Sequence, residues 1–341
     1  MQDTSYFTRR ILNVSIYGLF GLIIGVLYEI VRHDKSASLW GAGLGVLLGL
    51  VLGFFEEFIF HNSLRRMSFI KVMLLKAIIY MGIITFVFFA SIILYIVITG
   101  ADYNIYREYI IEGNLDIDII LVFLIFMVLT FFGQLDRLVG PGALFKYIIG
   151  KYKYPILEER IFMFLDIKSS TTIAEKLDHK DFYGFVNDFY YDLSGPILGT
   201  SAQIYQYVGD EIVLSWKKKR GIKNSNCVQV FFKIEDVINR RRDTYLRRYN
   251  LVPEFKAGVH CGEVISAEIG DIKKDIVYNG DVLNTASRIQ SVCNEYGEKL
   301  LVSKELLSLL DLPDYIKVRS LGLVDLRGKL HSVEIFAITK D

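Results

Sequence analysis

Four long apolar stretches within the first 140 residues constrain this chain more than any other feature of its sequence. They run approximately over residues 11–31, 38–60, 72–98 and 118–135. As a helix, each is long enough to cross a hydrocarbon core of roughly 30 Å. Because lipid offers backbone groups no hydrogen-bond partners, such stretches cross it as helices. We therefore predict an all-α transmembrane bundle of four helices over residues 1–137.

The charged residues gather after the fourth stretch, which predicts a separate water-exposed domain over residues 159–341. Hydrophobic residues make up 52% of the whole chain, more than is usual for a soluble protein. Between the two domains, residues 138–158 mix apolar and basic side chains, with Pro141 and Pro155 as helix breakers. We expect a short amphipathic linker helix there, which could transmit a signal or act as a passive tether.

Charged loop residues predict the orientation of the bundle. Arg9 and Arg10 precede the first stretch, and Arg65 and Arg66 lie between the second and the third, whereas the last loop is mostly acidic. The positive-inside rule then puts the N-terminus and the C-terminal domain in the cytoplasm. The three widely spaced cysteines fit a reducing compartment. We expect a multi-pass protein of the cell membrane whose partners include the lipid bilayer but no nucleic acid, since basic clusters such as "RRRDTYLRRY" are interpreted as a solvated helix face.

The second apolar stretch carries four glycines at four-residue spacing: Gly41, Gly45, Gly49 and Gly53. This spacing puts them on one helix face, where another helix can approach closely. Helix packing within one chain and a seam between two chains both remain open. Three glutamates lie near the ends of the stretches, and we expect them to reach the membrane interface: Glu29, Glu56 and Glu57.

From Arg160 onward, short apolar runs of strand length alternate with segments of helical spacing. The order is strand, helix, strand, strand, helix, strand, with further strands near the C-terminus. This order is typical of a ferredoxin-like α+β domain. The predicted fold class is thus α+β, with a ferredoxin-like domain preceded by the transmembrane bundle.

The stretch "FLDIKSSTTIAE" ends a predicted strand on a carboxylate, Asp166. A turn of Lys168, Ser169, Ser170 and Thr171 follows and leads into a helix, which Ser170 or Thr171 could cap. The N–H groups at such a helix start attract phosphate. We therefore predict that these four residues bind a nucleotide phosphate beside Asp166.

The stretch "IYQYVGDEIVLSW" reads as a β-hairpin with a turn at Gly209 and Asp210. Asp210 could stand close to Asp166, whereas Glu211 is expected to play a supporting part. Two carboxylates beside a phosphate-binding turn form a suitable site for Mg²⁺. Two such ions, at a spacing of about 3.5–4 Å, would activate one oxygen and stabilise the one that leaves.

The stretch "NGDVLNTASRIQ" places Asn284 and Arg288 four residues apart on a predicted helix. They share a face and could together stabilise the charge of a phosphoryl transition state. Further on, Lys329 follows Gly328 in a predicted strand turn, from which a lysine could reach a triphosphate.

Together and in this order, these motifs resemble the class III nucleotide cyclase catalytic domain, the adenylyl and guanylyl cyclase family. The resemblance runs from about Glu158 to Ile338 and rests on "FLDIKSST", "YVGDE", "GVHCGEV" and "GDVLNTASR". It implies a head-to-tail homodimer with each active site built across the interface. One protomer would bind two Mg²⁺ or Mn²⁺ through Asp166, Asp210 and the carbonyl of Ile167. The other would supply the groups that act on the phosphates: Asn284, Arg288 and Lys329.

The same resemblance implies that the ribose 3′-hydroxyl attacks the α-phosphate and that pyrophosphate leaves. Adenylyl cyclases of this family usually read adenine with a lysine and an aspartate or threonine. Those positions are Gln206 and Val277 here, and they do not match the guanylyl cyclase pair of Glu and Cys either. Gln206 can pair with either purine, and Val277 offers no hydrogen bond. ATP is the expected substrate because it is the family's commoner one, and GTP is the alternative.

Two other interpretations stay open. A diguanylate cyclase also uses a Gly-Gly-Asp-Glu hairpin, but its first glycine is Val208 here, and it has no part for the Asn284 helix. A membrane receptor with a catalytically weak, nucleotide-binding cyclase domain is the second. Gln206 and Val277 are the features that favour it.

Overall fold

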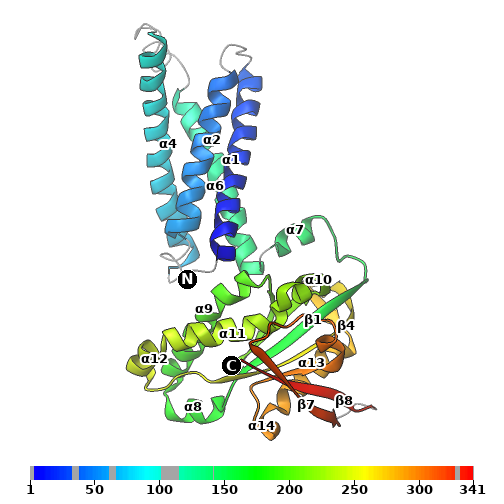
Figure 1. The fold of residues 1–341 in the computed structure, drawn as a ribbon. Coiled ribbons are helices and arrows are strands. Elements are labelled where there is room, and N and C mark those ends of the chain that lie inside the picture. The colour runs from blue at the N-terminus through cyan, green and yellow to red at the C-terminus, as the bar shows by residue number, and fades with distance from the viewer. Residues whose placement is uncertain are drawn as a thin grey trace. The chain divides into compact units, whose positions relative to one another are not determined.

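The computed structural model describes residues 4–32, 38–60, 67–100, 115–140, 142–326 and 331–340. The chain divides into two compact units, Met1–Val139 and Gly140–Asp341. Each unit has its own helices or sheet, drawn in Figure 1.

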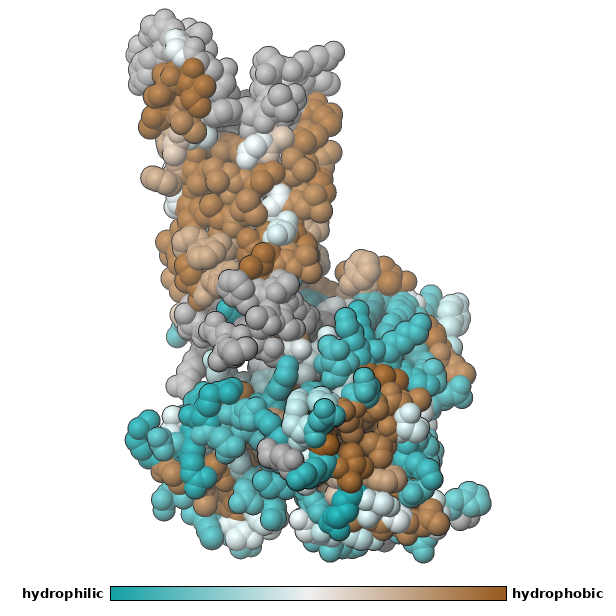
Figure 2. Space-filling model, viewed as in Figure 1, coloured by the Kyte–Doolittle hydropathy of each residue, from teal (hydrophilic) through white to brown (hydrophobic). Residues whose placement is uncertain are grey.

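Long helices make up the described part of the first unit: α1 (Thr4–Arg32), α2 (Ser38–Phe54) with its π-helical continuation η1 (Phe55–Phe60), α4 (Phe69–Thr99) and α6 (Leu115–Val139). Their apolar windows are long enough to cross a membrane: Arg10–Leu27, Gly41–Phe60, Phe69–Ile98 and Ile119–Asp136. Figure 2 shows apolar side chains over most of the visible surface of these helices. The predicted bundle of four apolar helices is confirmed.

The glycines of α2 pack against a matching set of glycines on α1. A Cβ atom added to Gly45 would lie 2.2 Å from the carbonyl oxygen of Gly21, and one added to Gly25 would lie 2.4 Å from that of Gly41. Two backbones approach this closely only where neither helix carries a side chain. The glycine face of α2 is therefore occupied by α1 of the same chain, as the intrachain alternative predicted.

Replacing Gly45 by alanine should destabilise the first unit by about 1–3 kcal/mol, because the methyl group has to push the two backbones apart. Gly43 provides the matched control, since a Cβ atom there meets nothing within 4 Å. Alanine at 43 should leave stability unchanged or raise it by up to about 1 kcal/mol through helix propensity. Thermal unfolding of both variants in the same detergent checks this, and equal melting temperatures would contradict the contact.

Glu56 and Glu57 were expected to extend outward, but both are buried inside the first unit. Lys76 of α4, only 1% exposed, lies 2.6 Å from the carboxylate of Glu56, and the hydroxyl of Tyr80 donates to it at 2.6 Å. The amide of Asn13 on α1 donates to Glu57 at 2.9 Å. Buried charges require such partners. The expectation rested only on how close each glutamate lies to the end of its apolar stretch, and that position does not reveal a partner on another helix. The side chain of Glu29 lies outside the described residues.

The second unit is built on a sheet with the strand order β2-β3-β1-β4-β6-β8-β7, in which β5 pairs with β4. The β4–β6 pair is parallel and the other pairs are antiparallel. The strands are β1 (Ile156–Ile167), β2 (Gln203–Val208), β3 (Glu211–Lys217), β4 (Phe255–Ile269), β5 (Asp275–Asn279), β6 (Leu300–Ser303), β7 (Ile316–Val324) and β8 (Val333–Lys340).

Helices of the second unit connect these strands: α7 (Ala143–Ile148), α8 (Ser170–Lys176), α9 (His179–Gly199), α10 (Lys218–Ile222), the 3-10 helix η2 (Lys223–Ser225), α11 (Asn226–Arg240), α12 (Arg242–Tyr249), α13 (Asp281–Ser291), α14 (Cys293–Tyr296) and α15 (Lys304–Leu307). The predicted ferredoxin-like α+β fold is confirmed. The strand β5 is an addition to the predicted order. Among the described residues of the predicted linker 138–158, helix is found at the end of α6 and over α7.

The two faces of the sheet carry different helices. On one face, β1 side chains such as Ile161 pack with Phe189 of α9 and Phe231 of α11 in the main core. On the other, Phe162 packs with Ala286 of α13. This alternation is that of a strand buried on both faces.

The helix α13 approaches β4 closely because the strand carries a glycine there. A Cβ atom added to Gly258 would lie 2.5 Å from the carbonyl oxygen of Ala286 and 2.2 Å from the amide nitrogen of Gln290. The "GVHCGEV" strand thus needs glycine at this position for the helix to lie on it. This contact brings α13 next to the end of β1 where Asp166 lies.

Candidate active site

Two strand ends bring Asp166 and Asp210 together. Asp166 is the next-to-last residue of β1 and lies opposite Glu211 in the antiparallel register of β1 and β3. Asp210 occupies the turn between β2 and β3, next to Gly209, whose φ of 63° favours glycine. Burial, then a hydrogen bond with Asp210 and the negative charge of Asp210, raises the pKa of Asp166 to about 6. The predicted proximity of the two carboxylates is therefore found.

This carboxylate pair fits a divalent cation. The Oδ2 atom of Asp210 is buried and has no hydrogen-bond partner, an arrangement that costs free energy unless a cation or a donor meets it. Burial, followed by the charges of Asp166 and Asp210, raises the pKa of Glu211 to about 7. In the described part of the chain no three His, Cys, Asp or Glu side chains form a metal cluster. Two carboxylates suffice for Mg²⁺ when water and substrate phosphates complete its shell.

The raised pKa of Asp166 predicts that the metal-free protein loses stability as the pH rises. An unfolded aspartate titrates near pH 3.9 and the folded one at about 6, so the folded state binds more protons between these values. The free energy of unfolding then falls from about pH 4 to pH 6 through Asp166, and the raised pKa of Glu211 extends the fall to about pH 7. Thermal unfolding in chelator should show this fall, Asp166→Asn should reduce it, and Mg²⁺ should restore stability at neutral pH. A wild type and a variant with the same pH dependence would contradict the assignment.

Two residues that the sequence reasoning missed hold Asp166 in place. The amide of Gln290 on α13 donates to Oδ2 of Asp166 at 3.0 Å. The ammonium group of Lys256 on β4 lies 3.7 Å from the same oxygen, and both residues lower the pKa of Asp166 against the larger effects that raise it. The apolar spacing of α13 places Gln290 on the buried face of the helix, so its inward position could have been predicted from the sequence. Lys256 could not, because it is placed opposite Asp166 by the register between β1 and β4.

Ile167, whose carbonyl is the third predicted metal ligand, is the last residue of β1 and follows Asp166 directly. The predicted phosphate-binding turn comes next. Ser169, at φ 57°, takes the N-cap position of α8 without a side-chain cap bond, so neither Ser170 nor Thr171 caps the helix.

Lys168, the first of the four turn residues, already has partners for its backbone amide and its side chain within the chain. The amide of Lys168 donates to the carbonyl oxygen of Glu254 at 2.8 Å. Its ammonium group lies 3.7 Å from the carboxylate of the same residue. Lys168 would therefore have to exchange this ion pair for a phosphate, whereas the three hydroxyl residues Ser169, Ser170 and Thr171 follow it around the turn.

Asn284 and Arg288 lie four residues apart on α13, and both reach the surface of the unit. They point away from the face of α13 that carries Ala286 and packs on the sheet. In one chain the two residues thus face outward, while Gln290 of the same helix faces Asp166. Lys329 lies outside the described residues.

The predicted base-reading positions lie on β2 and β5. Gln206 is exposed and lies opposite Val213 of β3, next to a register shift in β2. Val277 lies opposite Ala267 of β4. The residues adjacent to them, Tyr205 and Tyr278, contact each other with ring centroids 4.9 Å apart. The structure thereby brings the segments that carry the two positions close together, although Val277 alternates with Tyr278 along β5 and so points to the other face of the sheet.

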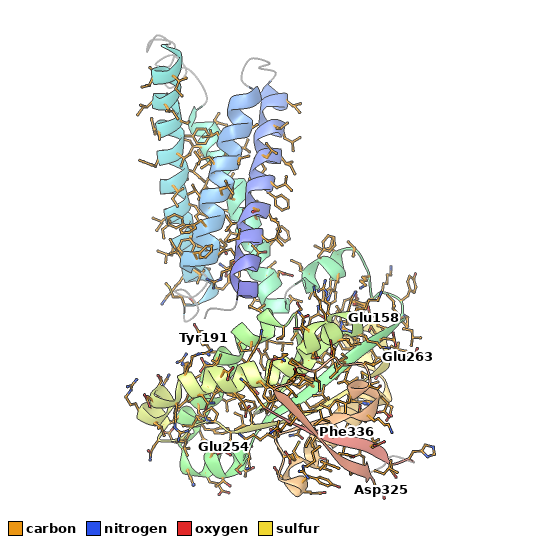
Figure 3. The ribbon with its side chains drawn as sticks, in the orientation of Figure 1. Glu158, Tyr191, Glu254, Glu263, Asp325 and Phe336 are labelled. Atoms are coloured by element: carbon orange, nitrogen blue, oxygen red, sulfur yellow. The ribbon has the colours of Figure 1, made fainter. Side chains whose placement is uncertain are left out.

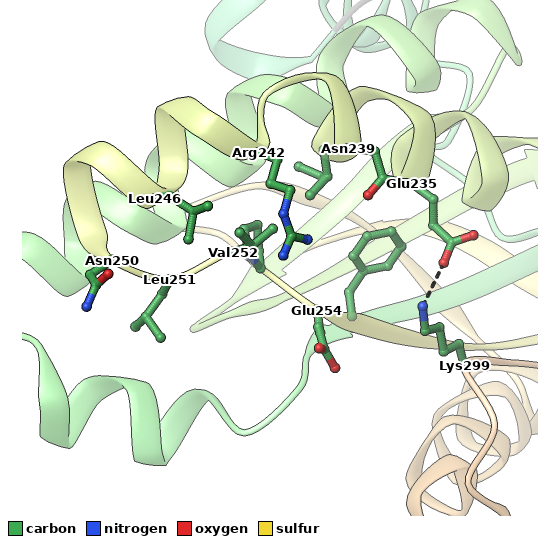
Figure 4. A pocket seen from close by; sticks show the side chains of 12 residues that line it. Glu235, Asn239, Arg242, Leu246, Asn250, Leu251, Val252, Glu254 and Lys299 are labelled. Atoms are coloured by element: carbon green, nitrogen blue, oxygen red, sulfur yellow. Dashed lines mark hydrogen bonds and ion pairs between the residues drawn. The ribbon is translucent and has the colours of Figure 1, made fainter.

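A pocket of about 390 Å³ lies elsewhere, between α11, α12 and the segment that leads into β4. Figure 4 shows Arg242, Asn239 and Asn250 around it, with Lys299 and Glu235 paired at 3.2 Å. Neither aspartate of the carboxylate pair lines it. We therefore assign the candidate active site to the carboxylate pair and not to this pocket.

Comparison with known sequences decides the family. The family described as "Adenylate and Guanylate cyclase catalytic domain" matches residues 155–340, more than half of the chain. The chain belongs to the adenylate and guanylate cyclase family. The family's domain begins at the start of β1 and ends with β8, so the carboxylate pair and α13 both lie inside this cyclase domain.

Relatives of the cyclase domain include enzymes of both kinds. Adenylate cyclase 2 of Rhizobium meliloti (strain 1021) is 28% identical over 206 residues, which cover 60% of this chain and 57% of that protein. Guanylate cyclase D of Mus musculus is 26% identical over 49% of this chain and 15% of its own length. This chain therefore spans little more than half of the first relative and a small part of the second.

Among solved structures, a bacterial light-regulated adenylyl cyclase aligns with a TM-score of 0.54 and 18% identity, over 63% of each chain. This likeness shows that the cyclase domain has the class III catalytic fold. The diguanylate cyclase interpretation loses its support, since the matched family is the class III one.

Proposed function

We propose that this chain is a membrane-anchored adenylate cyclase that converts ATP to 3′,5′-cyclic AMP and pyrophosphate. The observation that carries the proposal is the pair formed by Asp166 and Asp210, in a domain of the cyclase family, with a buried carboxylate oxygen lacking a partner. A structural pair of aspartates would be expected to have a donor for that oxygen. A cation-binding pair would not.

In the proposed reaction the oxygen of the ribose 3′-hydroxyl forms a bond to the α-phosphorus, the hydroxyl proton leaves, and the bond to pyrophosphate breaks. Asp166, Asp210 and the carbonyl of Ile167 would hold two Mg²⁺ or Mn²⁺ ions. Such ions, when bound, lower the pKa of the hydroxyl and offset phosphate charge. Gln290 and Lys256 keep the carboxylate of Asp166 fixed for this task.

The active site is proposed to form across a head-to-tail homodimer. Asn284 and Arg288 point outward from the chain that carries them, so they are available to a site on a second copy. There they would bind the transferring phosphoryl group and stabilise its charge. Lys329 of this second copy would bind the triphosphate. The turn of Ser169, Ser170 and Thr171, on the copy that carries Asp166, would bind it as well.

ATP is the proposed substrate, and GTP is the second candidate. Relatives named adenylate cyclase favour ATP as the substrate, and relatives named guanylate cyclase support GTP as the alternative. The specific observation behind GTP is the exposed Gln206, since an amide can pair with either purine. Val277 provides no hydrogen bond to decide between them.

The first unit is proposed to be the membrane anchor, since its helices are long and apolar enough to cross a bilayer. The basic residues that flank the apolar stretches favour a cytoplasmic cyclase domain in a multi-pass protein of the cell membrane. The proposed division is a bundle over 1–137, a linker over 138–158 and a catalytic domain over 159–341.

Incubating the purified full-length protein in detergent with Mn²⁺ and either ATP or GTP tests the function. We expect cyclic AMP from ATP, with a higher kcat/KM than for any product from GTP. A preference for cyclic GMP would replace ATP by GTP in the proposal. Nucleotide binding without any cyclic product would instead support the catalytically weak receptor.

A further inference from the structure

Arg160 on β1 carries a fully buried charge in the cyclase domain, with 0% of the residue exposed. Its Nε atom donates to Oε2 of Glu158 at 3.1 Å, and Glu158 lies at the start of the same strand (Figure 3). Its Nη1 atom donates to the hydroxyl of Ser215 on β3 at 3.1 Å. Burying a guanidinium is unfavourable unless its donors are satisfied in a fixed geometry. Arg160 therefore restricts the positions of the side chains that accept its hydrogen bonds.

The guanidinium group also reaches the strands that carry the two base-reading positions. Its Nη2 atom donates to the side-chain carbonyl of Gln203 at the start of β2, at 3.0 Å. Its Cζ atom lies 4.3 Å from the centre of the Tyr278 ring on β5, within the range of a cation–π interaction. One side chain on β1 thus holds both β2 and β5.

The strands β2 and β5 are not hydrogen-bonded neighbours. The sheet joins them only through the ladders of β3, β1 and β4, so side chains on this face provide the direct contact between them. Tyr205 and Tyr278 make that contact, with ring centroids 4.9 Å apart, and the amide of Tyr278 donates to the hydroxyl of Tyr205 at 3.5 Å. Arg160 stacks against one of these two rings.

Gln206 directly follows Tyr205, and Val277 directly precedes Tyr278. A shift of either ring would therefore move a base-reading position. We propose that Arg160 is a positioning residue for nucleobase selection: its buried guanidinium group fixes the distance between the strands on which positions 206 and 277 read the purine. The inference rests on the proposed function for these two positions, and Arg160 itself does not touch the substrate.

Arg160→Lys tests the inference, because lysine keeps the charge and loses the planar fork that satisfies three partners at once. The readout is the affinity of the full-length protein for 3′-deoxy-ATP and 3′-deoxy-GTP with Mn²⁺, since these nucleotides lack the attacking hydroxyl and cannot be turned over. We expect the wild type to bind one purine nucleotide more tightly than the other. In the variant, the ratio of the two dissociation constants should move about tenfold towards one. In turnover assays KM should rise while kcat changes by less than about threefold.

Two further variants separate positioning from a general loss of stability. Tyr205→Phe keeps the ring and removes only the hydroxyl that accepts from Tyr278, so it should fold and should reduce the preference partially. Arg241→Lys is the matched control: this arginine pairs with Asp192 at 2.7 Å, and Asp192 also accepts from Tyr245. It should leave the preference for one purine unchanged.

An unchanged purine preference in both Arg160→Lys and Tyr205→Phe would overturn the inference. So would a wild type that binds both deoxynucleotides equally, since there would be no selection to position. If Arg160→Lys does not fold, the binding ratio of Tyr205→Phe decides alone. Failure of the proposed function looks different: the wild type would bind the deoxynucleotides with a preference but form no cyclic product from ATP or GTP.

Discussion

Asp210→Ala lowers nucleotide turnover by at least about 10³-fold in the expected result, because a cation that positions and activates the reacting oxygens loses one of its two carboxylates. The fold should survive the change. Asp210 has a buried oxygen without a partner and raises the pKa of Asp166 by its charge, so the metal-free variant should melt at the same temperature as the wild type or higher. Initial rates with Mn²⁺ and ATP, together with melting temperatures in chelator, measure both effects.

Glu211→Gln is the matched control for this experiment. Glu211 is adjacent in the chain and lies opposite Asp166 in the strand register, but we assign it no cation. Its removal should reduce turnover by about tenfold or less. Binding of Mn²⁺, followed by electron paramagnetic resonance, should weaken strongly in Asp210→Ala and little in Glu211→Gln. Substantial cyclase activity in Asp210→Ala would show that the metal assignment is wrong.

The second expected result is recovery of activity when two inactive proteins are mixed. Asp210→Ala removes a carboxylate, and Arg288→Ala removes the outward-facing group on α13; each homodimer should then be nearly inactive. A mixed dimer has one site with both defects and one site with none, if each site uses Asp210 of one copy and Arg288 of the other. At equal amounts, about a quarter of the wild-type activity should return, since half of the dimers are mixed and each has one intact site.

The controls for mixing are chosen to exclude simple dilution. Asp210→Ala mixed with Asp166→Ala should stay inactive, because both changes affect the same half of a site. Proteins should be mixed under conditions that exchange subunits, and exchange should be followed by a fluorescence transfer pair on the two copies. Exchange without recovered activity would contradict a site shared between copies.

The sequence was sufficient to predict features whose determinants are local. Alternating apolar residues around Gly209 and Asp210 predicted the β2–β3 hairpin, and this hairpin places Asp210 beside Asp166. The four apolar stretches predicted the helices of the first unit because their length and composition are unusual outside membranes.

The remaining features depend on contacts between distant segments. Gln290 reaches Asp166 only after α13 has packed onto Gly258 of β4, and Lys256 reaches it only after β4 has paired with β1. Arg160 looks like an ordinary charged residue at a strand start, and its burial arises from partners on other strands. The error at Glu56 has the same origin, since Lys76 lies 20 residues away on another helix.

The glycine contact between α1 and α2 has a consequence for biosynthesis. The contacting carbonyls and glycines all lie between Tyr17 and Gly53, so every residue of this contact precedes α4 and α6 in the chain. In the proposed membrane anchor, the two helices would be able to enter the bilayer as a hairpin once this segment has left the ribosome, before α4 and α6 have been made. A substitution such as Gly45→Ala would then act at the translocation step, where a faulty hairpin exposes the whole nascent chain to quality control.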